Sequence, residues 1–113
     1  MKWDNQNHQF DQFALWWDAD SEYYLWGAAN TGQVFYKRFK DTLTIRGFID
    51  SDPQKQGISL SGLYINSLND VIAGNKNFKI VVTSGAYWEV RLKLIEAGYI
   101  EKVDFCDHKL FTS

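Results

Sequence analysis

The chain has 113 residues, of which 45% are hydrophobic and 23% charged, and this length supports a single domain with one hydrophobic core. The formal net charge is −2 at pH 7 and the basic residues are scattered along the chain, so we expect no nucleic-acid partner. The lone Cys106 cannot form an internal disulfide, and no apolar run reaches the roughly 20 residues of a membrane span, so we expect a cytoplasmic protein.

The first predicted element is a helix over residues 4–18, which Asp4 or Asn5 can cap. Aromatic residues make up 17% of the chain, and apolar surfaces are often partner surfaces, so this helix favours a homodimer or a contact with a partner enzyme. Its apolar face consists of four side chains at helical spacing: Phe10, Phe13, Ala14 and Trp17.

The next three elements form a strand, helix, strand unit. Apolar runs predict strands over Tyr23–Trp26 and residues 43–50, and an amphipathic stretch predicts a helix over Thr31–Lys40. Pro53 follows the second strand and fixes a turn. Such units are right-handed, so we expect the two strands to be parallel.

The alternation continues in the middle of the chain. Residues 54–62 are expected to form a loop, and a short third strand is predicted over residues 63–65. A short helix follows over Ser67–Ala73; Ser67 can cap it and Gly74 ends it.

The most apolar strand is predicted over residues 79–84, and a helix follows over residues 86–97, with Gly98 at its end. A fifth strand is predicted around residues 103–106. The apolar side of the last helix is expected to consist of Trp88, Leu92 and Ile95.

The turn between the first strand and its helix has the spacing of a phosphate-binding loop. In the G-x-G-x-x-G fingerprint, the first glycine permits the turn, the second admits a pyrophosphate and the third lets helix and strand pack closely. Gly27 and Gly32 occupy the outer positions, whereas Ala29 places a methyl group at the middle one. Free N–H groups at the helix start favour a phosphate. We predict that the ligand contacts Gly27, Ala28, Ala29, Asn30, Thr31 and Gly32.

The strand, turn and helix pattern predicts an α/β fold with three layers. We expect a Rossmann-like, mostly parallel sheet of about five strands with helices on both faces, plus the N-terminal helix. The chain then divides into an aromatic helix over residues 1–21 and a Rossmann-like nucleotide-binding domain over residues 22–113.

An acid follows the second predicted strand. Asp50 lies 18 positions beyond Gly32, close to the spacing of roughly 20 at which an acid binds the ribose hydroxyls of NAD. Asp50 and the adjacent Ser51 are therefore candidate ligand-binding residues. An acid at this position repels a 2′-phosphate, which favours NAD over NADP. The alternative is that the glycines only permit a tight turn and that Asp50 is a solvated strand end.

A second loop is expected beside the first. In a doubly wound sheet, the segment Thr83-Ser84-Gly85-Ala86 lies next to the glycine loop at the topological switch point. The Ser84 hydroxyl and the Gly85 N–H are candidate contacts to a phosphate or a sugar. The alternative is that Ser84 only caps the following helix.

Four segments resemble the N-terminal nucleotide-binding domains of nucleotide-sugar acyltransferases and dehydratases from bacterial surface-polysaccharide biosynthesis. They are residues 24–32, 46–53, 62–65 and 80–87, within a resemblance that covers residues 22–107. The resemblance implies that the glycine loop and Asp50 bind NAD or a nucleotide-sugar. The chain departs from the pattern at Ala29, and no transferase or dehydratase part accompanies the domain, so the resemblance implies binding alone.

Other reactive residues are not predicted to form a site. Tyr36 and Lys40 match the Tyr-x-x-x-Lys spacing of short-chain dehydrogenases, but they lie on the first helix, where that pair does not occur. His8 and His108 are far apart, and Cys106 is expected to be buried. Asp104 and Asp107 flank Cys106 without a visible shared pocket. We predict no metal site and no catalytic residue.

The sequence therefore favours a module that binds a nucleotide, a dinucleotide or a nucleotide-sugar and that recognises its ligand without turning it over. The alternative is a protein-interaction or oligomerisation module with a vestigial nucleotide pocket, in which the N-terminal helix docks a partner. A small oxidoreductase is a third possibility, for which no proton donor can be named.

Overall fold

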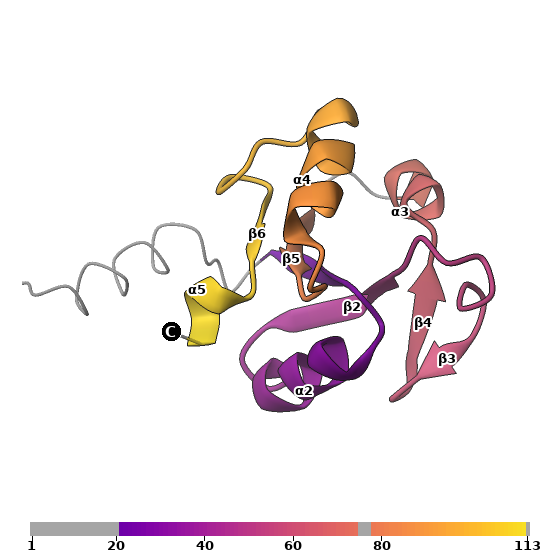
Figure 1. The fold of residues 1–113 in the computed structure, drawn as a ribbon. Helices are drawn as coiled ribbons and strands as arrows, with labels where there is room; N and C mark the ends of the chain where they lie inside the picture. The colour runs from indigo at the N-terminus through magenta and orange to yellow at the C-terminus, as the bar shows by residue number, and fades with distance from the viewer. Residues whose placement is uncertain (1–20, 75–77, 113) are drawn as a thin grey trace, which may run out of the picture.

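The computed structural model describes residues 21–74 and 78–112. Over these ranges the chain is an α/β fold in which helices cover both faces of a mostly parallel sheet (Figure 1), so the predicted fold class is confirmed. Each strand and helix predicted within these ranges begins and ends within two residues of its observed bounds. The helix predicted over residues 4–18 lies outside the described residues.

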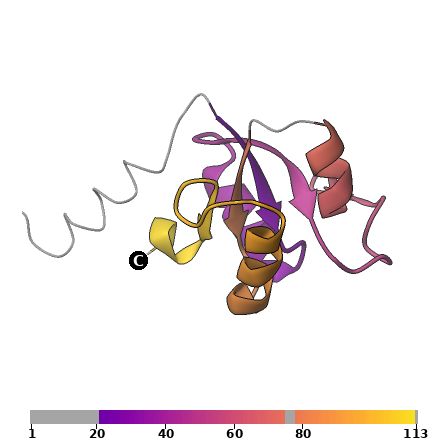
Figure 2. The ribbon, with the colours of Figure 1, turned by 90° about the horizontal axis from the view of Figure 1, so that it is seen from above.

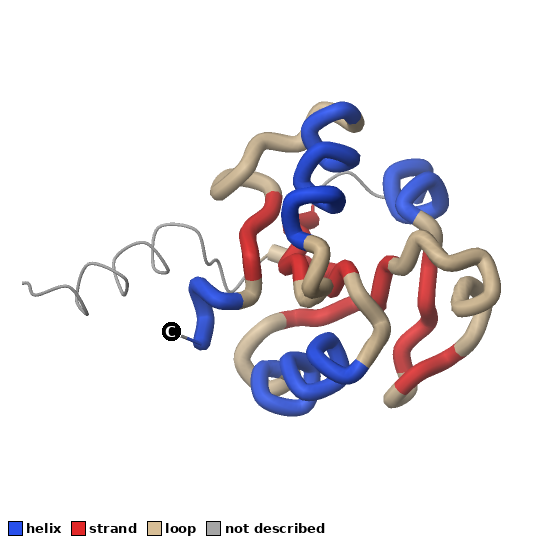
Figure 3. The backbone as a smooth tube through the Cα atoms, in the orientation of Figure 1, coloured by secondary structure: helices blue, strands red, loops and turns tan. Residues whose placement is uncertain are grey.

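The sheet has six strands in the order β3-β4-β2-β1-β5-β6, and its pairs are parallel except for the antiparallel pair of β3 and β4. Figure 3 shows the strands in red. The order reverses at β1, because the chain adds strands on one side of it and then crosses to the other. This is the topological switch at which open α/β sheets bind ligands. The strands are β1 (Glu22–Trp26), β2 (Thr44–Ile49), β3 (Ser59–Leu60), β4 (Leu63–Asn66), β5 (Phe78–Val82) and β6 (Phe105–Asp107).

Helices lie on opposite faces of this sheet (Figures 1 and 2). α2 covers one face, and α3 and α4 cover the other. In the part of the chain that the structure describes, no helix is long and apolar enough to cross a membrane. The sequence did not predict α5, which is too short to show a periodic pattern. The helices are α2 (Asn30–Phe39), α3 (Leu68–Gly74), α4 (Tyr87–Glu96) and α5 (Lys109–Thr112).

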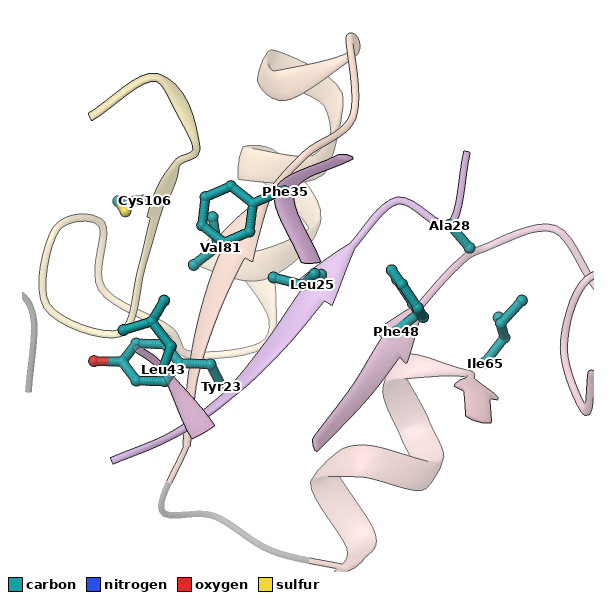
Figure 4. Close-up of a cluster of buried hydrophobic side chains, with 9 residues drawn as sticks. All are labelled: Tyr23, Leu25, Ala28, Phe35, Leu43, Phe48, Ile65, Val81 and Cys106. Carbon is teal, nitrogen blue, oxygen red and sulfur yellow. The ribbon is translucent and has the colours of Figure 1, made fainter. Parts of the chain in front are cut away.

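Two buried clusters hold the layers together, one on each face. In β1 the side chains alternate: Tyr23 and Leu25 join the cluster under α2, and Trp26 joins the cluster under α3 and α4. Figure 4 shows the α2-side cluster, in which Phe35 from the helix meets the strands. Cys106 is a fully buried member of this cluster, as the sequence predicted.

The segment predicted as a loop over residues 54–62 contains strand β3. Ser61 and Gly62 connect it to β4 with φ angles of +55° and +84°, and two successive positive φ angles are typical of a type I′ hairpin. A two-residue strand is too short to show an alternating pattern. The crossover from β2 to β4 therefore contains no helix, and its turn over residues 53–57 is joined to the end of β2 by a hydrogen bond from Gln56 Nε2 to the Asp50 carbonyl.

The predicted apolar side of α4 is wrong. Trp88 and Leu92 are 71% and 59% exposed, whereas Val90 and Leu94 are buried against the sheet. Apolar residues occur on both sides of this helix, so periodicity alone does not tell which side faces the sheet. On the exposed side, the Trp88 ring contacts the Tyr87 ring at 5.8 Å between centroids, and the Arg91 guanidinium lies 5.4 Å from its centroid.

Candidate functional site

The loops after β1 and β5 meet at the carboxyl edge of the sheet. The two strands are parallel neighbours, with Trp26 in register with Val82. The Thr83 N–H donates to the Trp26 carbonyl at 2.9 Å, which extends this pairing into the loops. The sequence prediction that the two loops lie side by side is thus confirmed.

Gly27 needs to be glycine for two reasons. Its φ of +124° lies in the region that L side chains rarely adopt. In addition, a Cβ atom there would lie 3.0 Å from the Thr83 Oγ1 and 3.1 Å from the Ser84 N. Its N–H donates to the Ile49 carbonyl at 2.8 Å, so the turn is joined to strand β2 as well.

Gly32 permits the close approach of α2 to this turn. A Cβ atom on Gly32 would lie 1.9 Å from the Gly27 carbonyl oxygen, which is a backbone atom and cannot swing away. This is the role that the fingerprint gives to its third glycine. The start of α2 is consequently held directly against the end of β1.

Thr83 joins the two loops, a role that the sequence did not predict; it indicated only the neighbouring Ser84 and Gly85 as ligand contacts. Its side chain is buried, and its Oγ1 lies 3.1 Å from the Trp26 carbonyl oxygen and 3.0 Å from that of Gly27. The hydroxyl donates to these acceptors, as a buried polar group must. The sequence feature that could have indicated this role is the position of Thr83, a polar residue directly after the most apolar strand.

The start of α2 presents backbone N–H groups at the same edge. Ala29 is its N-cap residue, and no side-chain hydrogen bond caps the helix in the described part of the chain. Asn30 and Thr31 are exposed, and no acid lies in the first turn. Ala29 has φ −92°, a conformation open to any residue, so the alanine at the middle fingerprint position fits without strain. The helix dipole favours an anion here.

Asp50 faces the glycine loop. Its Oδ2 accepts a hydrogen bond from the Ala28 N–H at 3.2 Å, and its Oδ1 accepts one from the Asp52 N–H at 2.9 Å. The side chain is only 14% exposed, so Asp50 is not a solvated strand end. Lys55 Nζ lies 3.8 Å from Oδ2. This lysine comes from the helix-free crossover and was not predicted to be near the acid.

A cavity of about 310 Å³ opens beside Asp50. Its walls come from the carboxyl ends of β1, β2 and β4 and from one side of α4. Gln56 lies at this cavity and donates from Nε2 to the Asp50 carbonyl at 2.8 Å. The lining residues are Trp26, Asp50, Ser51, Gln56, Ser67, Leu68, Asn69, Lys93 and Glu96.

A second cavity of about 310 Å³ lies on the other side of the glycine loop. Its walls include Asn30 and Thr31 from the start of α2 and His108 from the end of β6. The His108 Nδ1 lies 3.1 Å from the Val82 carbonyl oxygen and 3.0 Å from an Asp107 carboxylate oxygen. The sequence indicated no role for this histidine, and the structure places it at the carboxyl edge of the sheet.

The second loop lies at the edge as predicted, but Ser84 is not the helix cap. Ala86 is the N-cap residue of α4, and its N–H donates to the Ser84 Oγ at 3.0 Å. Gly85 is exposed, and a Cβ atom on it would meet nothing within 4 Å. Contacts from Ser84 and Gly85 to a ligand remain a prediction.

The other reactive groups do not gather at this edge. Burial raises the pKa of the Cys106 thiol well above its usual range, which keeps the sulfur protonated. Tyr36 packs against the core beside Phe48 rather than lining either cavity. Over residues 21–74 and 78–112, no group of three or more His, Cys, Asp and Glu side chains is arranged to hold a metal ion. His8 lies outside the described residues.

Solved structures with a similar fold include those of RSP, a Rex-family repressor. The repressor alone matches with a TM-score of 0.57 and 19% identity over 81% of this chain and 56% of that chain. Its complex with β-NADH matches with a TM-score of 0.56 and 19% identity, over 81% of this chain and 57% of that chain. Its complex with β-NAD⁺ and operator DNA matches with a TM-score of 0.59 and 18% identity, over 95% of this chain and 61% of that chain. No protein-family model and no curated protein matches the chain.

At this level of identity the likeness shows a shared Rossmann-like fold. The chain spans 56% to 61% of the length of these repressor chains. None of the three is a surface-polysaccharide enzyme, so they do not support that resemblance.

The prediction that excluded a nucleic-acid partner is wrong. It rested on net charge, yet a protein of this fold is a repressor whose structure contains operator DNA. Net charge averages over a whole chain, whereas DNA contacts depend on the charges of one small surface, so a value of −2 does not exclude them.

Proposed function

We propose that the chain binds a nicotinamide dinucleotide, NAD⁺ or NADH, across the carboxyl edge of its sheet. The observation that carries this proposal is that the glycine loop holds the start of α2 and is also hydrogen-bonded to Asp50. Gly27 and Gly32 hold the uncapped start of α2 against β1, and Asp50 accepts a hydrogen bond from this same loop at Ala28. The repressor complexes with β-NADH and β-NAD⁺ support the choice of dinucleotide.

The two cavities suit the two halves of such a ligand. The adenosine would occupy the cavity beside Asp50, whose carboxylate accepts hydrogen bonds from ribose hydroxyls. The pyrophosphate would lie at the N–H groups of Ala29, Asn30 and Thr31. Each cavity has the volume of a small binding site, and only an extended ligand would reach both.

The other half of the ligand would lie over the ends of β5 and β6. His108 lines the second cavity, and Ser84 and Gly85 belong to the loop that follows β5. A bound nicotinamide ring supplies reversible hydride transfer. In our proposal the residues of this chain bind and orient the ligand.

A thermal-shift panel of NAD⁺, NADH, NADP⁺ and UDP-glucose tests this proposal. A ligand at about one hundred times its dissociation constant adds roughly 2.7 kcal/mol, which raises the melting temperature of a small domain by several degrees. We expect this shift with NAD⁺ or NADH and a smaller one with NADP⁺, whose 2′-phosphate meets Asp50. A shift with UDP-glucose alone would favour a nucleotide-sugar instead. No shift with any ligand would favour the interaction module.

A second candidate function is DNA binding in a repressor-like assembly. The match to the operator-bound repressor extends over 95% of this chain, which favours this candidate. Fluorescence anisotropy of a labelled DNA duplex, with and without NADH at low salt, tests it. A rise in anisotropy that NADH reverses would support a ligand-controlled DNA contact, and an unchanged anisotropy would contradict it.

A further inference from the structure

His108 directly follows β6 at the edge of the sheet where the glycine loop lies. β6 is the parallel neighbour of β5, and Asp107 is in register with Val82. The backbone N–H of His108 donates to the Val82 carbonyl at 3.0 Å, which extends the pairing one residue beyond the strand. The His108 side chain is only 19% exposed. The sheet therefore determines where this side chain lies.

Two acceptors determine which ring nitrogen of His108 carries the hydrogen. Nδ1 lies 3.1 Å from the Val82 carbonyl oxygen and 3.0 Å from a carboxylate oxygen of Asp107. A carbonyl and a carboxylate only accept hydrogen bonds, so Nδ1 must be the donor. The other ring nitrogen, Nε2, is then an acceptor in the neutral ring and a donor in the protonated ring.

The Nε2 atom is available to a ligand. Within residues 21–74 and 78–112, the hydrogen bonds of the His108 ring involve Nδ1 alone. A polar atom on a largely buried ring normally has a hydrogen-bond partner. Because the His108 ring lines the second cavity, a ligand that enters this cavity can supply that partner.

The second cavity also connects His108 to the start of α2. Asn30 and Thr31 line it, and their N–H groups belong to the proposed pyrophosphate site. A ligand that extends from this site into the cavity therefore approaches the histidine. An apolar wall with few polar groups suits a flat ring that bears one hydrogen-bonding substituent. The remaining lining residues come from the same helix and are Val34, Phe35, Arg38 and Phe39.

We propose that Nε2 of His108 binds the carboxamide of the nicotinamide ring and so determines that this end of the ligand enters the second cavity. This inference rests on the proposed binding of a nicotinamide dinucleotide. A carboxamide has both N–H donors and a carbonyl acceptor, so it pairs with Nε2 in either protonation state of the imidazole. Val82 and Asp107 hold the ring in the orientation for this contact.

Calorimetric titrations of NADH and of ADP-ribose into the full chain test the contact. ADP-ribose retains the adenosine, the pyrophosphate and the second ribose but has no nicotinamide, so it is the matched control ligand. In His108→Asn, the shorter amide can still donate to the Val82 carbonyl from the place of Nδ1, but nothing replaces Nε2. In His108→Gln, the longer amide reaches the place of Nε2.

We expect His108→Asn to lower the affinity for NADH about five- to tenfold, the loss of one hydrogen bond, and to leave the affinity for ADP-ribose unchanged. His108→Gln should recover most of the affinity for NADH. An unchanged affinity of His108→Asn for NADH would overturn the inference and leave the dinucleotide site standing.

Two further results would contradict the contact. Equal losses for NADH and ADP-ribose would mean that the substitution alters the whole site rather than the nicotinamide contact. Equal affinities of the wild type for NADH and ADP-ribose would overturn the inference without any variant, because the nicotinamide would then contribute nothing. A wild type that binds neither ligand would contradict the proposed function itself, and this inference with it.

Discussion

At the residue scale, Gly27 and Gly32 of the fingerprint have no room for a side chain, whereas Gly85 does. Gly32 has a backbone oxygen where its Cβ would lie, whereas Gly85 has open space. The role of Gly32 was predictable, because the spacing of the fingerprint encodes the packing of helix against strand. The role of Thr83 was not, because its acceptors lie 56 and 57 positions away in the sequence.

The contrast between these glycines gives a matched pair of variants. We expect Gly32→Ala to destabilise the protein by several kcal/mol, of the order found for overpacked cores, because α2 must move away from Gly27. Gly85→Ala should change the free energy of unfolding by less than about 0.5 kcal/mol, as exposed sites do. Urea denaturation of both variants measures the difference, and similar stabilities would contradict the assigned packing.

The thiol of Cys106 offers a second test at this scale. Burial raises its pKa, so little reactive thiolate exists in the folded protein. We expect no reaction with a thiol reagent at pH 8 until urea unfolds the chain. Rapid modification of the native protein would show that the α2-side core opens.

At the element scale, the α4 helix is tied to the following loop by Tyr87, Arg91 and Glu101. Tyr87 donates a hydrogen bond to Glu101, and Arg91 Nε lies 2.9 Å from the same carboxylate. The hydrogen bond from Tyr87, with a smaller contribution from Arg91, lowers the pKa of Glu101. Burial, and next the hydrogen bond to Glu101, raise the pKa of Tyr87.

These shifts predict how stability depends on pH. Stability from a lowered carboxyl pKa is present above the ordinary value of 4.5 and is lost as the pH falls below it. Stability from a raised tyrosine pKa is present below the ordinary value of 10 and is lost as the pH rises above it. Tyr87→Phe should therefore lower the free energy of unfolding by about 1 kcal/mol at pH 7, and by progressively less at acidic and at alkaline pH. Tyr64→Phe, at an exposed ring, is the control, and a pH-independent difference would contradict the assignment.

The sequence predicted most elements and missed two short ones. Strands and helices with a full apolar pattern were placed within two residues, whereas β3 and α5 were missed. The orientation of α4 was wrong because both of its sides carry apolar residues. Local pattern identifies an element, but the face that it buries depends on neighbours that are distant in the sequence.

At the scale of the whole molecule, the candidate site exists only because separate segments converge. The glycine loop follows β1, Asp50 follows β2 and Thr83 follows β5, and the parallel sheet brings their carboxyl ends to one edge. The sequence predicted Gly27, Gly32 and Asp50 because a motif connects them. It did not predict Lys55, Gln56 or His108 at this edge, because no local pattern links them to the loop.

The most direct test of dinucleotide binding is a calorimetric titration of NADH into the full chain, its Asp50→Ala variant and its Asp41→Ala variant. Asp41 is an exposed acid after the far end of α2 and serves as the matched control. We predict saturable binding by the wild type and by Asp41→Ala, and a loss of at least about tenfold in affinity for Asp50→Ala, as expected for a charged hydrogen-bond partner. Equal affinities in all three proteins, or no binding to the wild type, would contradict the account.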